Sequence, residues 1–317
     1  MKITSIVGAV LLVTSGGMAQ QPARPAITGI AFMRVYTTDA AAAQRFYGQT
    51  LGFEQHVMDG LWVYPVNKLQ WLEVVPHAGP KTNDMMAAIA FTTRDAAGLE
   101  RYLAAHGVTA EQPLKDGEFG VRDPEGNLVI FVQSEAVQSA VVRAADKEDR
   151  LGTIARMVAD APASPHATSH RIIHVGFIVD DPEKENTFWR ELLGFRPYWH
   201  GTMHPGRTDW MSMQVPDGSD WIEYMLHATE PPSLHDSGMM DHFSLGTARM
   251  DDVLAQLQKN DCQGDHCESI QVGKDGKIQL NLFDPDLTRV EYMEFTPAIK
   301  PCCSDFTAAH PTATEAR

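Results

Sequence analysis

Two halves of the sequence follow the same pattern, and this duplication most strongly constrains the fold. The tripeptide Leu-Gly-Phe occurs at 51–53 and 193–195, each time after a predicted helix. A turn that begins with Asp-Pro occurs at 123–124 and at 284–285, each time before a final predicted strand. In each half the predicted order is strand, helix, three strands, and then the same order again. Such self-similarity indicates two copies of one α+β domain.

The length of 317 residues suits two domains, and an apolar content of 44% indicates globular cores. The pattern places the first domain at 27–135 and the second at 170–297. Between them, 136–160 is predicted to be a helix, and 161–169 is a linker rich in Pro, Ala and Ser. The tail at 298–317 has little periodicity, and its prolines predict an extended path that either wraps the domain or stays mobile.

The N-terminus has the features of a secretory signal peptide at residues 1–19. Lys2 supplies a positive charge, residues 6–13 form a short apolar run, and Gly17-Met18-Ala19 is a small-x-small cleavage site. We therefore expect a secreted or periplasmic protein. The apolar run is too short for a stable membrane span in the mature chain.

The formal charge is −15, from 26 basic and 41 acidic residues. This balance argues against nucleic acid or an anionic membrane surface as a partner and leaves a small molecule. An oxidising compartment would favour disulfides, and Cys262 and Cys267 flank a tight turn that would let them pair. A metal site that also includes His266 is the alternative. The sequence does not assign a role to Cys302 and Cys303.

Four predicted strands of the second half each carry one metal-competent side chain near the middle. These residues are His174, Glu223, His242 and Glu291. Two imidazoles and two carboxylates suit one divalent ion such as Ni, Co, Zn, Fe or Mn. The sequence therefore predicts a metal site that these four side chains share.

The repeated Leu-Gly-Phe and Asp-Pro motifs resemble those of the vicinal oxygen chelate (VOC) superfamily, which includes glyoxalase I, extradiol dioxygenases and bleomycin-resistance proteins. The resemblance covers about 27–135 and 170–297. It implies two tandem VOC domains, each of paired βαβββ units forming a cupped mixed sheet whose concave face holds a metal. The usual ligands come from the first, fourth, fifth and last strands, which are the positions of the four residues above. This His/Glu/His/Glu set is similar to that of bacterial glyoxalase I.

The first domain departs from this ligand pattern. The corresponding positions hold Phe32, Glu73, a residue near Ala88, and Ile130, so only the glutamate is retained. We therefore expect the first domain to bind no metal and to act as a scaffold. Because a glutamate occurs there without a site, Glu223 is the least secure of the four predicted ligands.

The resemblance to glyoxalase I implies lyase or isomerase chemistry on a small oxygen-bearing substrate. The metal would polarise a substrate carbonyl, and Glu291 or Glu223 would move the proton. Gln279 and Asn281 alternate on the penultimate strand and are predicted to contact the substrate. Trp221 belongs to an aromatic and Met-rich set predicted to line an apolar pocket.

Two other functions stay open. In an Fe(II) extradiol dioxygenase, His174, His242 and Glu291 would form a triad of two histidines and one carboxylate. Against this, Asn281 stands where those enzymes have a tyrosine, and no histidine lies between 267 and 284. The third function is non-catalytic ligand binding of the bleomycin-resistance type. Family members often build sites across a dimer, so a homodimer is also compatible with the sequence.

Overall fold

The structure is a computed structural model. It describes residues 23–313 except 59, 78, 80, 81, 83, 84, 116, 134–153, 155, 156, 229 and 230. The predicted signal peptide and most of the predicted helix at 136–160 lie outside the described residues, although 157–160 are helical. No helix among the described residues is long and apolar enough to cross a membrane.

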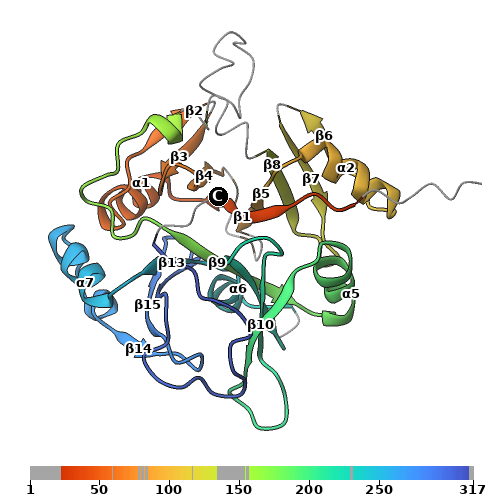
Figure 1. Ribbon diagram of the computed structural model, residues 1–317. Coiled ribbons are helices and arrows are strands. Elements are labelled where there is room, and N and C mark those ends of the chain that lie inside the picture. Colours follow the sequence, from red (N-terminus) through yellow and green to blue (C-terminus); the bar gives the residue numbers. More distant parts are fainter. Residues whose placement is uncertain are drawn as a thin grey trace, which may run out of the picture.

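The chain forms two mixed sheets of eight strands each, one per domain (Figure 1). The first sheet has the order β2-β3-β4-β1-β5-β8-β7-β6. Its strands are β1 (Ile27–Thr37), β2 (His56–Met58), β3 (Leu61–Pro65), β4 (Trp71–Pro76), β5 (Met86–Thr93), β6 (Gln112–Lys115), β7 (Glu118–Arg122) and β8 (Leu128–Gln133). The pairs β1–β4 and β5–β8 are parallel, and β1 and β5 join the two βαβββ units in antiparallel fashion.

The second sheet repeats this topology in the order β10-β11-β12-β9-β13-β16-β15-β14. Its strands are β9 (Ile172–Val179), β10 (Arg196–Gly201), β11 (Trp210–Gln214), β12 (Trp221–Leu226), β13 (His242–Thr247), β14 (Ile270–Val272), β15 (Ile278–Phe283) and β16 (Arg289–Glu294). The parallel pairs are again the corresponding ones, β9–β12 and β13–β16. The predicted fold of two tandem domains of paired βαβββ units is therefore confirmed.

The first helix of each domain begins at an aspartate cap and ends at the repeated glycine. The helices are α1 (Ala40–Gln44), continued by the π-helical turn η1 (Arg45–Thr50); α2 (Ala96–Ala105); α5 (Pro182–Asn186), continued by η2 (Thr187–Leu192); α6 (Leu234–Met240); α7 (Met250–Lys259); and the 3-10 turn η3 (Asp265–Cys267). Asp39 and Asp181 accept hydrogen bonds from backbone N–H groups in the first turns of α1 and α5. Gly52 (φ 76°) and Gly194 (φ 79°) have positive φ, which explains the repeated tripeptide.

Two elements were missed by the sequence analysis, and one feature differs from it. The strand β6 contains a proline and is exposed along its length, so it lacks the alternation of a half-buried strand. The short helix α6 begins at the Ser233 cap and has no strong apolar period. The predicted helices at 40–50 and 183–193 end in π-helical turns, in which Leu51 N donates to Phe46 O and Leu193 N donates to Phe188 O.

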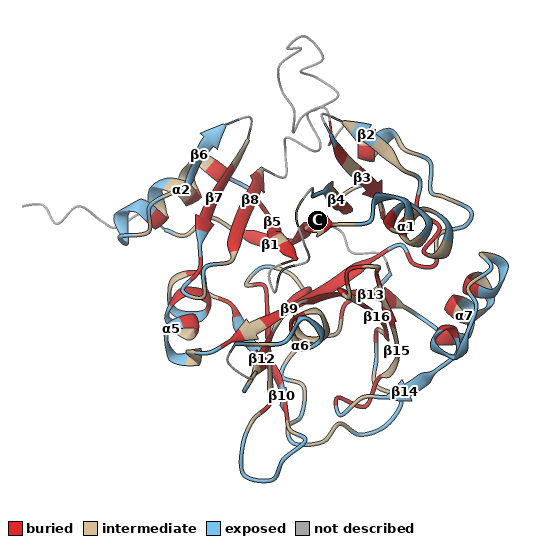
Figure 2. Cartoon of the chain, turned by 180° about the vertical axis from the view of Figure 1, so that it is seen from behind, coloured by how far each residue is buried: buried red, intermediate tan, exposed pale blue. Residues whose placement is uncertain are grey.

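Both domains contribute to one large hydrophobic core, and the central strands are buried (Figure 2). The ring of Phe91 on β5 lies 5.6 Å from that of Trp189 in η2 and 5.5 Å from that of Phe195. These edge contacts pack the first sheet against the first helix of the second domain. The two domains are therefore held together by a shared core.

Each Asp-Pro turn docks on the start of the other domain's first helix. Asp286 accepts hydrogen bonds from Thr37 Oγ1 at 2.7 Å, Thr38 N at 3.0 Å and Thr38 Oγ1 at 2.6 Å, all next to α1. In the reverse direction Glu125 accepts hydrogen bonds from Asp180 N at 2.9 Å and Asp181 N at 2.8 Å, next to α5. This exchange is a second interdomain connection, made by polar groups.

The tail packs on the second domain, so of the two predicted paths its described part takes the wrapped one. Cys302 N donates to Lys274 O at 2.8 Å, Thr307 N to Tyr198 O at 3.1 Å, and Gln214 Nε2 to Ala309 O at 2.8 Å. The ring of Phe306 lies 4.8 Å from that of Tyr198. The tail thus crosses from the turn before β15 to the edge strand β10.

Candidate metal centre

Four adjacent central strands bring the predicted ligands together. The order β12-β9-β13-β16 lies in the middle of the second sheet. Ser244 on β13 pairs both with His174 on β9 and with Glu291 on β16. His242 lies two residues before Ser244 and therefore points to the same face of the sheet. We call this the inner face; it also carries Glu223 of β12.

The ligand atoms of these residues converge. His174 Nε2 lies 3.0 Å from His242 Nε2 and 3.1 Å from Glu291 Oε2. His242 Nε2 lies 3.9 Å from Glu291 Oε2 and 3.8 Å from Glu223 Oε2. The three atoms of His174, His242 and Glu291 all lie within 4.8 Å of one another, and Glu223 is outside this group.

Gly176 makes room for the His242 ring. It pairs with His242 across β9 and β13, and a Cβ at this position would lie 2.0 Å from His242 Cε1. Any larger residue at position 176 would displace the imidazole of His242. The glycine therefore lets the His242 ring lie directly over the backbone of β9.

Burial favours the neutral form of both histidines. His242 Nδ1 lies 2.7 Å from Met240 O, so it must donate, and Nε2 presents its lone pair to the site. Burial lowers the pKa of His174, although the nearby Glu291 opposes the effect. Burial, together with the charge of Arg289, lowers the pKa of His242 well below its usual value. Neutral imidazoles are the form that binds a metal.

The two carboxyl groups are in different electrostatic environments. Burial would raise the pKa of Glu291, but the charge of Arg289 and the adjacent imidazole of His174 outweigh this effect, and the pKa is lowered. Burial, followed by repulsion from Glu291, raises the pKa of Glu223 to about 8. Glu223 Oε1 accepts a hydrogen bond from Ser212 Oγ at 3.1 Å. Neighbouring carboxyls with pKa values pushed apart are typical of separate acid and base roles.

The residues present fit a divalent metal. His174, His242 and Glu291 are fully or almost fully buried, and Glu291 Oε2 has no hydrogen-bond partner among the described residues. A buried carboxylate oxygen without a donor is costly unless a cation satisfies it. Two neutral imidazoles and one carboxylate suit several first-row metals, and the geometry does not choose among them.

A cavity of about 340 Å³ opens beside this group. Its lining includes Glu223, Glu291 and Arg289, together with the two aromatic residues Trp199 and Trp210. A cavity of this size can hold a small molecule next to the candidate ligands.

The residues predicted to contact substrate lie in different places. Gln279 lines the cavity. Asn281 pairs with Glu291 across β15 and β16, and its buried Oδ1 has no hydrogen-bond partner among the described residues. Trp221 is only 2% exposed, is not part of the cavity lining, and stacks on His174 with ring centroids 4.8 Å apart.

Sequence analysis missed three polar residues near the centre, namely Ser212, Lys277 and Arg289. Arg289 Nη1 lies 4.0 Å from Glu291 Oε1, and the spacing of two residues on one strand could have indicated this. Ser212 pairs with Glu223 across β11 and β12, which only the register reveals. Lys277 is fully buried among rings, and burial lowers its pKa to about 8.

The corresponding face of the first domain is filled. Phe32 stacks on Trp71 at 5.0 Å, in the place of His174 and Trp221. Glu73 accepts hydrogen bonds from Arg34 Nε at 2.6 Å and Trp71 Nε1 at 2.9 Å. Other apolar residues of this face, which include Ala88 and Ile130, pack with the interdomain residues Ile154 and Val158. Within the described part of this domain no group of metal-competent side chains comes together.

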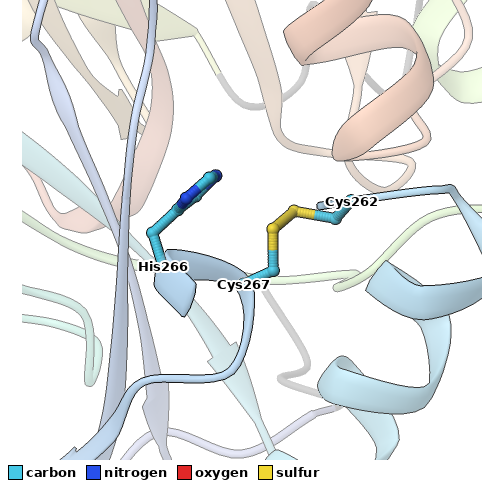
Figure 3. A group of neighbouring side chains, drawn as sticks. All are labelled: Cys262, His266 and Cys267. Carbon is cyan, nitrogen blue, oxygen red and sulfur yellow. A yellow bond between two sulfur atoms is a disulfide. The ribbon is translucent and has the colours of Figure 1, made fainter. Parts of the chain in front are cut away.

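The cysteines form two disulfides, Cys262–Cys267 and Cys302–Cys303. Cys262, His266 and Cys267 lie close together (Figure 3). The sulfur atoms of Cys262 and Cys267 are bonded to each other, so they are not available as thiolate ligands. The disulfide therefore favours a structural loop at 262–267 over a metal site.

Comparisons with known proteins agree with the fold. The family model described as the Glyoxalase/Bleomycin resistance protein/Dioxygenase superfamily matches residues 29–131 and 171–292. The comparison with curated proteins gives no match.

Similar solved structures include homoprotocatechuate 2,3-dioxygenase from Brevibacterium fuscum in an anaerobic complex with 3,4-dihydroxyphenylacetate. It is 18% identical, with a TM-score of 0.56, over 86% of this chain and 82% of that chain. A room-temperature structure of an extradiol ring-cleaving dioxygenase from B. fuscum is 20% identical, with a TM-score of 0.59, and the match covers 86% of this chain and 73% of that chain. At this identity the likeness shows a common fold. With the family model matching both halves, the chain belongs to the glyoxalase/bleomycin resistance protein/dioxygenase superfamily.

Proposed function

We propose that the protein is a divalent-metal enzyme that moves a proton on a small substrate with neighbouring oxygen atoms, as a lyase or isomerase. The observation that carries this proposal is the pair of carboxyl groups, Glu223 and Glu291, in the lining of one cavity. Glu291 joins the histidine pair, while Glu223 stands 3.8 Å from His242 without joining the close group. In the proposed enzyme one carboxylate holds the metal and the other moves the proton beside it.

The chain supplies each part of such a reaction. His174, His242 and Glu291 would hold the metal, which when bound polarises a substrate carbonyl and makes a neighbouring C–H acidic. The charge of a bound divalent ion would favour the ionised form of Glu223. Glu223 then accepts that proton and returns it to the adjacent carbon. Its Oε1 is held by Ser212, so Oε2 is the atom that faces the site.

The cavity walls bind and orient the substrate. Arg289 and Gln279 offer donors to substrate oxygens, and Trp199 and Trp210 exclude water from the apolar side. Excluding water strengthens the electrostatic interactions inside the site.

The test combines metal analysis with hydrogen exchange. The purified chain is loaded with Ni²⁺, Co²⁺, Zn²⁺ or Mn²⁺ and incubated in D₂O with hemithioacetals and 2-hydroxy ketones, and deuterium uptake is followed by NMR. We expect Glu223→Gln to keep stoichiometric metal and to slow exchange by about 10²-fold or more. Glu73→Gln, at the equivalent position of the first domain, is the matched control and should keep the rate. An unchanged rate in Glu223→Gln, or no metal in the wild type, contradicts the proposal.

Oxygen-dependent cleavage of a catechol ring is the second candidate. It is favoured by the close group of two histidines and one carboxylate, which leaves Glu223 outside. The fold-level likeness to ring-cleaving dioxygenases supports it, at no more than 20% identity in the two comparisons described. Oxygen uptake by the Fe²⁺-loaded chain with catechols, without hydrogen exchange on the ketones, would select this reaction.

We also propose that the enzyme works outside the cytoplasm. The sequence at residues 1–19 and the presence of two disulfides support this location. Fractionation of cells that express the full chain tests it, because export predicts a shortened protein in the periplasm or medium.

A further inference from the structure

The two histidines of the metal centre are held in different ways. His242 Nδ1 donates to Met240 O at 2.7 Å, which fixes its ring. His174 Nδ1 is buried and has no hydrogen-bond partner in the described part of the chain. A metal-binding histidine normally has its second ring nitrogen anchored, and losing the anchor weakens metal binding. Something else must therefore set the orientation of His174.

An aromatic ring lies directly against His174. The centroid of Trp221 is 4.8 Å from that of His174, and the two planes are inclined by 31°. The two residues are also partners in the register of β12 and β9, so the backbone keeps their side chains next to each other. A tilted ring contact at this distance leaves the imidazole little room to rotate.

Trp221 is itself immobilised. It is 2% exposed and packs against Tyr198, whose ring centroid lies 5.3 Å away. The Nζ atom of Lys277 lies 4.4 Å from the centre of the Trp221 ring, and among the described residues it has no hydrogen-bond partner. A desolvated ammonium over an indole ring is a favourable cation–π contact. Lys277, Trp221 and His174 thus form one connected stack.

We infer that Trp221 is a positioning residue for the metal ligand His174, which it holds by stacking in place of the missing hydrogen bond. The stacked ring keeps Nε2 of His174 directed at His242 and Glu291. Lys277 fixes the Trp221 ring in turn. This inference rests on the proposed metal centre and assigns to Trp221 a role different from the predicted substrate contact.

The first domain provides an internal control. Trp71 stacks on Phe32 with centroids 5.0 Å apart and planes inclined by 30°, and the two residues are register partners as in the second domain. Phe32 cannot bind a metal. Replacing Trp71 therefore removes the same kind of packing without touching a ligand.

The test measures metal affinity rather than turnover. Dissociation constants for Co²⁺ are obtained by competition with a chromogenic chelator, and the absorption spectrum of the Co²⁺ form reports ligand geometry. We expect Trp221→Leu to weaken Co²⁺ binding about 10- to 100-fold and to change the spectrum. Trp221→Phe restores a stacked ring and should stay close to wild type. Trp71→Leu should lower the melting temperature but leave the dissociation constant within about twofold.

The outcomes separate this inference from the proposed function. If the wild type binds neither Co²⁺ nor Zn²⁺, the metal centre itself is wrong and the inference falls with it. If the wild type binds Co²⁺ and Trp221→Leu binds it equally well, only the inference is overturned. The same holds if Trp71→Leu weakens binding as much as Trp221→Leu. Should Trp221→Leu not fold, Trp221→Met fills more of the space without a ring and must show the same weakening.

Discussion

Glu185 is a fully buried carboxyl at the junction of the two domains, and its replacement by glutamine is predicted to change how stability depends on pH. Its Oε1 accepts a hydrogen bond from Glu125 N at 2.9 Å, and its Oε2 has no partner in the described part of the chain. Burial, followed by repulsion from Asp123, raises the pKa of Glu185 to about 8. The folded protein therefore keeps this group protonated at neutral pH.

A raised pKa in the folded state means that the folded chain holds a proton that the unfolded chain has released. Stability from this group is present at low pH and is lost as pH rises towards the folded pKa. Each such proton gives a slope of about 1.4 kcal/mol per pH unit. Between pH 5.5 and 7.5 the glutamate is ionised in the unfolded chain and mostly protonated in the folded chain. Glu185 alone should therefore lower the free energy of unfolding by about 2–3 kcal/mol over this interval.

Urea unfolding of the wild type and of Glu185→Gln at pH 5.5, 6.5 and 7.5, followed by tryptophan fluorescence, measures this difference. Glutamine mimics the protonated acid and does not ionise. The free energy of unfolding of the variant should therefore fall by about 2–3 kcal/mol less than that of the wild type between pH 5.5 and 7.5. Glu183→Gln, on the exposed side of the same helix, should keep the wild-type dependence. Parallel curves for the wild type and Glu185→Gln would refute the reasoning.

Three further changes test other parts of the structure. His242→Ala should abolish stoichiometric metal binding in elemental analysis, because it removes one of three converging ligands; full retention of metal would contradict the site. Asp286→Ala should lower the free energy of unfolding by about 2–4 kcal/mol, because it breaks three interdomain hydrogen bonds, whereas the exposed Asp305→Ala should have little effect. The double variant Cys262→Ser, Cys267→Ser opens a short loop and should lose about 2 kcal/mol in chemical unfolding, and an unchanged midpoint would argue against the bond.

The duplicated fold was predictable because its signals are local. Helix caps, the glycine with positive φ and the Asp-Pro turns are each encoded within a few residues, and they occur twice in the same order. The choice of His174, His242 and Glu291 rested on their positions within predicted strands and on the resemblance to the ligand pattern of the VOC superfamily. Their convergence depends on neighbouring strands at the centre of one sheet, which the repeat also specifies.

Other features depend on contacts that no local pattern encodes. The stack of Lys277 on Trp221 joins β12 to the turn before β15, and the anchoring of Glu223 by Ser212 needs the register of β11 and β12. The tail takes its path because Phe306 packs on an apolar cluster of the second domain that includes Tyr198 and Trp221. In these cases the partner is distant in sequence, so only the assembled structure identifies it.

The exchanged Asp-Pro turns make the first domain part of the support of the candidate metal centre. The turn that begins at Asp284 leads directly into β16, the strand that carries Arg289 and Glu291. Asp284 Oδ2 accepts a hydrogen bond from Tyr47 OH at 2.9 Å, so a side chain of the first domain fixes the start of that strand. A gene fragment that encodes only the second domain would leave this buried acid without its partner. The position of Glu291 in the candidate site therefore depends on both domains, and a substitution as remote as Tyr47→Phe would act on it through the backbone of β16.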